Sequence, residues 1–202
     1  FVMELTKLQK QGMKSLVLDL RGNGGGYLNS ATSLSDQFLG NGKLIVYTKG
    51  LHEPRTDYKA TESGLFEKGQ LVVLIDEGTA SASEVVAGAI QDLDRGVIIG
   101  RRSLGKGLVQ EQFGFEDGSA MNLTVARYYT PSGRSIQKSY QKGTKVYKEE
   151  LNKRYLHGDL VSLDSAKADT NFSKTKQFRT AQGRIVYSGG GIMPDHFIPL
   201  VP

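Results

Sequence analysis

The chain has 202 residues and 38% hydrophobic content, enough to bury the core of one or two domains. The absence of cysteine excludes disulfides and thiolate metal sites, and no stretch approaches the roughly 18 apolar residues of a membrane-spanning helix. The formal net charge of +5 is spread along the chain without a lysine–arginine block, so we expect no nucleic-acid binding.

The first third of the chain predicts helix, strand, glycine turn and helix. Residues 4–11 have a helical pattern that ends at Gly12 and is already under way at the first residue, so we expect a piece of a longer protein. A short buried strand at 15–20 leads through the glycine turn 21–26 to a helix at 28–39. The turn matches neither the P-loop nor the dinucleotide fingerprint, and by itself it predicts only a tight strand-to-helix connection. A further strand at 43–49 precedes a polar connection at 50–69 without a strong pattern.

Residues 71–110 predict the centre of the fold: a buried strand at 71–75, a helix, a second strand at 97–99 and a third from Leu108. Ser81 stands where the first strand turns into the helix. With Glu84 it fits the S-x-x-E capping box, so it can simply cap the helix. It can also be a nucleophile, because free amides at a helix N-terminus can hold a developing oxyanion.

A serine nucleophile needs a base. His52, His157 and His196 all lie in segments rich in turn residues and charge, whereas Lys106 lies between two glycines and could act in its neutral form. The spacing of Ser81 and Lys106 alone leaves both interpretations of the serine open.

The second half predicts antiparallel strands at 110–115 and 119–129, joined by a hairpin turn at 116–118. Residues 138–183 carry eight lysines and predict a charged surface insertion that is partly helical around 148–156, followed by a strand at 184–187. Asp92 lies about three helical turns beyond Ser81, so we expect it to have a structural role. Strands alternating with helices, then a run of strands, predict an α/β fold with a mainly parallel sheet of βαβ units and an antiparallel extension.

Five motifs follow one another in order: DLRGNGGG at 19–26, TASASEVVAGAIQD at 79–92, GRRSLGKGLVQ at 100–110, ARYYTPSGRSIQ at 126–137 and GGGIMPD at 189–195. Together they resemble the signature of the carboxyl-terminal processing (tail-specific) proteases. The resemblance implies that Ser81 is the nucleophile, that Lys106 is the general base and that Gln110 orients the lysine. It also implies that the backbone amides of Gly26 and Ala82 form the oxyanion hole.

The chain departs from that family's pattern at two positions beside the lysine. Arg101 and Leu104 stand where similar proteins commonly carry an acidic residue and an aromatic one. Because these positions flank Lys106 and are not part of the dyad, the departure concerns substrate preference.

The resemblance also implies a fold like that of the Clp protease and crotonase group. The catalytic core would comprise residues 1–137 and 184–202, with 138–183 as the insertion. The implied activity is that of a serine endopeptidase that cleaves protein or peptide substrates near their C-termini through an acyl-enzyme, with no metal or cofactor. The resemblance further implies an upstream PDZ domain and a location in the bacterial periplasm or cell envelope. It also allows for a homo-oligomer.

Two other functions compete with this one. The alternative is a catalytically silent module on the same scaffold that binds a ligand or peptide, which the intact Ser81, Lys106 and Gln110 disfavour. An acyl-CoA hydratase of the same broad fold would need acidic catalysts near the glycine loops.

Overall fold

The computed structural model describes residues 1–61, 64–168 and 177–201. Its central sheet consists of four parallel strands in the order β1 (Ser15–Asp19), β4 (Gln70–Ile75), β5 (Val97–Gly100) and β10 (His196–Phe197). Side chains alternate along β4, so that Leu71, Val73 and Ile75 are buried. The predicted α/β class with a mainly parallel sheet is confirmed.

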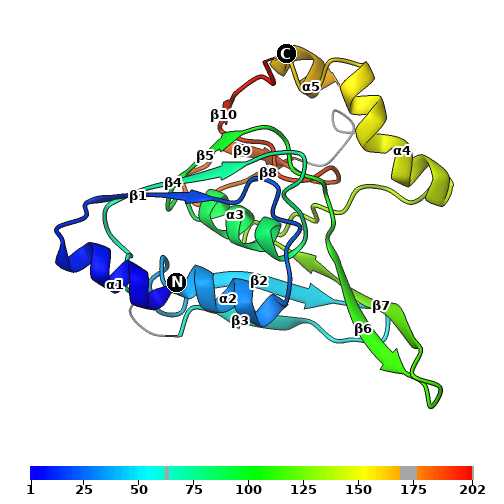
Figure 1. Ribbon diagram of the computed structural model, residues 1–202, viewed down its shortest axis with the longest axis horizontal. Coiled ribbons are helices and arrows are strands. Elements are labelled where there is room, and N and C mark those ends of the chain that lie inside the picture. Colours follow the sequence, from blue (N-terminus) through cyan, green and yellow to red (C-terminus); the bar gives the residue numbers. More distant parts are fainter. Residues whose placement is uncertain (62–63, 169–176, 202) are drawn as a thin grey trace.

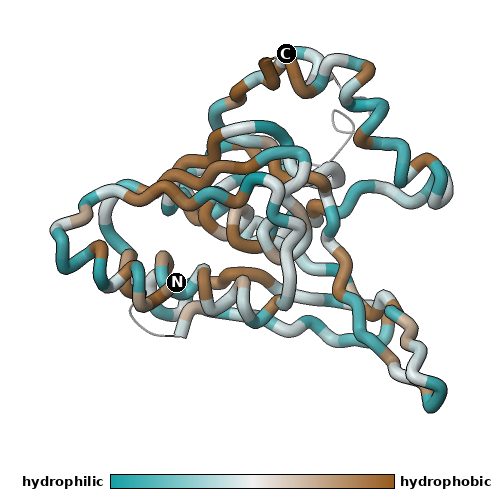
Figure 2. The backbone as a smooth tube through the Cα atoms, in the orientation of Figure 1, coloured by the Kyte–Doolittle hydropathy of each residue, from teal (hydrophilic) through white to brown (hydrophobic). Residues whose placement is uncertain are grey.

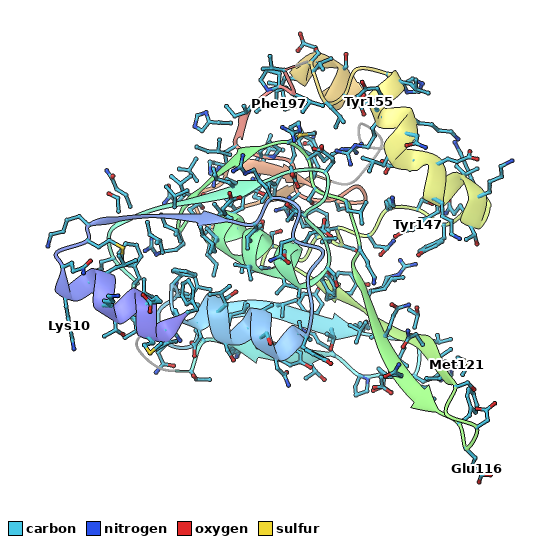
Figure 3. The ribbon with its side chains drawn as sticks, in the orientation of Figure 1. Lys10, Glu116, Met121, Tyr147, Tyr155 and Phe197 are labelled. Carbon is cyan, nitrogen blue, oxygen red and sulfur yellow. The ribbon has the colours of Figure 1, made fainter. Side chains whose placement is uncertain are left out.

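The antiparallel strands form a second sheet, in the order β3 (Thr56–Lys59), β2 (Leu44–Lys49), β7 (Ala120–Tyr129) and β6 (Leu108–Gly114). They are therefore a separate layer, whereas the sequence suggested an extension of the first sheet. The hairpin of β6 and β7 projects from the body as an arm, with Glu116 and Met121 at its far end (Figures 1 and 3). The strand β3 lies within the connection 50–69, where the sequence showed no pattern.

Helix α3 (Ala82–Asp92) lies between the two sheets (Figure 1), and all eleven of its residues are buried. It contacts β5 on one side and β2 on the other, and α2 (Leu28–Asp36) packs along it. Gly88 allows the segment that follows β7 to approach α3 closely, since a Cβ added there would lie 2.8 Å from Thr130 Cγ2. Figure 2 shows the hydrophobic segments gathered around the parallel strands, with a hydrophilic tip on the β6–β7 arm.

The remaining elements lie around this core. They are α1 (Val2–Lys10), α4 (Gly143–Leu156), α5 (Leu163–Ala168) and a two-stranded ribbon of β8 (Gln177–Arg179) and β9 (Ile185–Tyr187). Both the helix predicted around 148–156 and the strand predicted at 184–187 are present, as α4 and β9. Among the described residues, no helix is long and apolar enough to cross a membrane.

Candidate active site

Three loops meet at one edge of the parallel sheet. The chain leaves β1, β4 and β5 at their carboxyl ends, and these strands are neighbours, so the glycine turn, the Ser81 corner and the Lys106 loop emerge side by side. This edge is where open α/β sheets bind their ligands. Hydrogen bonds join the loops: the Ala80 amide donates to the Asn23 carbonyl at 3.0 Å, and the Leu104 amide donates to the Thr79 carbonyl at 2.9 Å.

A cleft of about 400 Å³ opens beside these loops. All five residues that the sequence suggested for the site line it: Gly26, Ser81, Ala82, Lys106 and Gln110. The other lining residues are Tyr27, Leu28, Val85, Leu108, Val109, Gln112, Asn122 and Tyr128. The five predicted residues thus come together from segments up to 84 positions apart, Gly26 and Gln110 being the two ends.

Ser81 has an unusual backbone at the strand-to-helix corner, with φ 56° and ψ −120°. Among the described residues, only Ser81 and Asp94 have positive φ without being glycine. Such strained conformations cluster at functional sites, and a sharp corner of this kind exposes a serine hydroxyl above a sheet. Ser83, in the first helical turn, instead donates its hydroxyl to Asn23 Oδ1 at 2.9 Å and is buried.

Glu84 connects the serine corner to the lysine loop. It forms the predicted capping box, in which the Ser81 amide donates to Oε2 at 2.9 Å. The same fully buried carboxylate also accepts the Lys106 amide at 2.8 Å, the Gly105 amide at 2.8 Å and the Ser103 hydroxyl at 2.5 Å. Burial raises the pKa of Glu84, and these hydrogen bonds act in the opposite direction. The S-x-x-E pattern predicted only the local half of this role, because the loop contacts lie 19 to 22 positions away.

The glycines on either side of Lys106 pack against two other motif segments. A Cβ at Gly105, which has φ +87°, would lie 2.9 Å from the Gly191 amide nitrogen, and one at Gly107 would lie 3.0 Å from the Gln137 amide nitrogen. The Gly107 amide also donates to Gln137 Oε1 at 2.7 Å. The segments 126–137 and 189–195 therefore pack against the lysine loop.

Tyr128 on β7 is a site residue that the sequence interpretation missed. Its hydroxyl donates to the Lys106 carbonyl, and its side chain lines the cleft. Burial raises the pKa of Tyr128 well above its usual value of 10, and a hydrogen bond with the Ser81 side chain acts against that shift. The tyrosine lies inside the motif ARYYTPSGRSIQ, which was the available signal.

The glycine turn has a steric requirement at Gly25 and none at Gly26. Gly25 has φ +95°, and a Cβ there would lie 2.6 Å from the Ala80 carbonyl oxygen and 2.8 Å from Ser81 Cβ. A Cβ at Gly26 would meet no atom of the described residues within 4 Å. Gly25 therefore presses against the serine corner, while Gly26 lines the cleft.

Asp92 lies at the opposite end of α3 from Ser81 and has structural contacts. It pairs with Arg134 at 2.8 Å, both side chains being fully buried, and its Oδ2 accepts the Ser132 amide at 3.0 Å. Arg101, one of the two departures noted in the sequence, pairs with Glu77 at 2.6 Å. Neither residue is among those that line the cleft.

Several known proteins are similar to this chain. The model of Peptidase family S41 matches residues 1–145. The chloroplastic C-terminal processing peptidase of Tetradesmus obliquus is 44% identical over 135 residues, which are 66% of this chain and 28% of that protein. A probable CtpA-like serine protease of Staphylococcus haemolyticus is 30% identical over 194 residues, 87% of this chain and 39% of that protein. Among solved structures, the photosystem II D1 C-terminal processing protease has a TM-score of 0.61 and 42% identity, covering 67% of this chain and 35% of that one.

The chain thus spans 28% to 39% of the length of these three proteins. The family match takes in most of the 202 residues, including the glycine turn, the serine corner and the lysine loop. It confirms the resemblance drawn from the motifs. The chain belongs to peptidase family S41.

Proposed function

We propose that this chain is the catalytic part of a serine endopeptidase that cleaves protein or peptide substrates near their C-termini with a Ser81/Lys106 dyad. The observation that carries the proposal is that Ser81 and Lys106 line the same cleft, at the carboxyl edge of a parallel sheet. The named activities of the relatives, C-terminal processing peptidase and serine protease, support the reaction and the substrate class.

In the proposed reaction, the neutral amine of Lys106 takes the hydroxyl proton as Ser81 Oγ attacks a peptide carbonyl. The backbone amides of Gly26 and Ala82 donate to the oxyanion that forms. The Lys106 ammonium then protonates the leaving amine, and an acyl ester remains on Ser81. Lys106 next takes a proton from water, which attacks the ester; the ammonium then returns this proton to Ser81 Oγ as the ester bond breaks and the new C-terminus leaves. Gln110, which follows the lysine on β6, orients the amine.

Three features of the whole protein belong to the same proposal. An upstream PDZ domain would bind the substrate C-terminus. The protein would act in the bacterial periplasm or cell envelope, and it could do so as a homo-oligomer. Residues 1–137 and 184–202 would form the catalytic core and 138–183 an insertion. No cofactor takes part in the reaction as written.

The nucleophile is tested by two single substitutions in the full-length protein. Ser81→Ala should abolish both peptide hydrolysis and labelling by a fluorophosphonate, because the attacking hydroxyl is gone. As a lost helix cap it should cost only about 1 kcal/mol of stability. Ser83→Ala is the matched control: it loses the bond to Asn23 and should keep most of its turnover. An inactive Ser83→Ala with an active Ser81→Ala would reverse the assignment.

The base is tested at Lys106. Lys106→Arg keeps the positive charge but should be inactive, because a guanidinium does not give up its proton in proteins. Appreciable turnover in this variant would rule out the base role. Wild-type protein that neither hydrolyses peptides nor reacts with the fluorophosphonate would instead indicate the silent binding module.

A further inference from the structure

Helix α4 is polar and lies at the outside of the molecule, yet it carries one deeply buried cation (Figure 1). Of its fourteen residues, only Arg154 is buried, with 3% of its surface exposed. Arginine is almost never fully buried unless it is paired. The partners of Arg154 therefore reveal what α4 does in this fold.

Those partners belong to the loop that leads to Lys106. Arg154 Nη2 donates to the Arg102 carbonyl at 2.7 Å, and Nη1 donates to the Ser103 carbonyl at 3.1 Å. Two donors in the rigid plane of one guanidinium thus hold two consecutive carbonyls. This fixes the backbone three and four positions before Lys106.

Ser103 passes this restraint on to the proposed dyad. Its hydroxyl donates to Glu84 and accepts the Ile192 amide at 2.7 Å. Glu84 in turn accepts the amides of both Lys106 and Ser81. A continuous path of hydrogen bonds therefore runs from α4 through Ser103 and Glu84 to the two residues of the dyad.

Charges around the helix strengthen the attachment. Arg102 is 2% exposed and lies 3.4 Å from Glu150 of α4 and 3.6 Å from Asp159, just beyond the helix. Lys138 pairs with Glu150 at 3.1 Å. Burial and the neighbouring Arg102 lower the pKa of Arg154 to about 10, while Glu150 and Asp159 act in the opposite direction.

We propose that Arg154 is a positioning residue for catalysis, which holds the Lys106 loop in place from helix α4. The inference rests on the proposed function, because it supposes that Lys106 is the base. It gives Arg154, which lies in the charged segment and beyond the end of the family match at residue 145, a role in the reaction: aligning the lysine with the serine.

The test compares three variants of the full-length protein: Arg154→Met, Arg154→Lys and Lys153→Met. Methionine fills similar space but removes both donors to the Arg102 and Ser103 carbonyls, so Arg154→Met should be less stable than wild type and is assayed well below its melting transition. Arg154→Lys restores a donor but not the planar pair. Lys153→Met removes the adjacent, exposed cation of the same helical turn, whose partner is Glu149 at 3.8 Å, and is the matched control.

We expect Arg154→Met to lower kcat at least tenfold, with KM changed less than twofold, at a temperature where melting curves show it folded. Arg154→Lys should recover part of the loss, and Lys153→Met should behave as wild type. Hydrogen–deuterium exchange should show faster exchange of the Gly105 and Lys106 amides in Arg154→Met only. A folded Arg154→Met with wild-type kcat and wild-type exchange at these amides would overturn the proposal.

The exchange measurement also separates this inference from the proposed function. If Ser81→Ala proved active, the dyad would be wrong, and only the kinetic part of the expectation would fall with it. Loss of kcat with unchanged exchange would show that Arg154 acts by another route than the loop, and would equally overturn the positioning role.

Discussion

Replacing Gly25 by alanine should destabilise the protein by about 2 to 5 kcal/mol. One part of this cost is conformational, because alanine in a left-handed backbone loses roughly 1 to 2 kcal/mol relative to glycine, and Gly25 has φ +95°. The other part is steric. The new Cβ would lie 2.6 Å from the Ala80 carbonyl, 2.7 Å from the Ala82 amide nitrogen and 2.8 Å from Ser81 Cβ. Overpacking of this kind costs about 1 to 3 kcal/mol.

Gly26→Ala is the control for this prediction, because it adds the same methyl group one residue later. No described atom lies within 4 Å of that Cβ, so we expect a change within about 0.5 kcal/mol, or a small stabilisation through the unfolded state. Urea unfolding at unchanged m-value measures both variants. For a protein of this size, a loss of about 3 kcal/mol corresponds to a fall in Tm of roughly 6 to 12 °C. If Gly26→Ala proved the more damaging change, the packing of the glycine turn on the serine corner would be wrong.

Three further predictions follow from the site and its surroundings. Glu84→Gln should lower the free energy of unfolding by about 2 to 4 kcal/mol, because an amide leaves one or two of the four buried donors without an acceptor; urea curves that match wild type would contradict this. Arg21 holds the pKa of Asp19 at about 2, below its ordinary 3.8. The contribution of this ion pair to the stability of the fold is therefore fully present above about pH 4 and is lost as the pH falls through about 2. A carboxyl NMR titration of the wild type with a midpoint near 4 would refute the pairing. Tyr128→Phe should lower the free energy of unfolding by about 1 kcal/mol and reduce kcat, because the Lys106 carbonyl loses its donor. Tyr129→Phe is the control and should leave kcat unchanged, since the Tyr129 ring stacks on Tyr47. Equal kcat values in the two variants would count against Tyr128 as a site residue.

Local patterns predicted the parts of the site that depend on neighbours in sequence. The S-x-x-E spacing of Ser81 and Glu84 predicted the helix start, and the apolar run before it predicted the buried strand β4. Contacts made across the fold had no such signal. The bonds from the lysine loop to Glu84, and from Tyr128 to the Lys106 carbonyl, depend on how the sheets pack.

Two elements show the same limit for the fold. The strand β3 is mostly exposed, so its residues lack the alternation that marks a half-buried strand. Strand β10 has two residues, too few for any period, and exists because it pairs with β5. In α4, the sequence indicated a helix in a charged segment, but a buried arginine cannot be told from an exposed one until the helix has been docked.

The burial of α3 has a consequence for how long the proposed dyad would stay aligned. A helix enclosed on all sides opens only when the whole fold opens, so Ser81 keeps its place for as long as the domain remains folded. Lys106 is held by a loop, and loops open locally at a lower free energy. Ser81 therefore stays in position until the domain unfolds, whereas Lys106 stays in position only until the few hydrogen bonds of its loop break. If the two residues form the proposed dyad, the loop determines the fraction of time in which the lysine is in position for the serine.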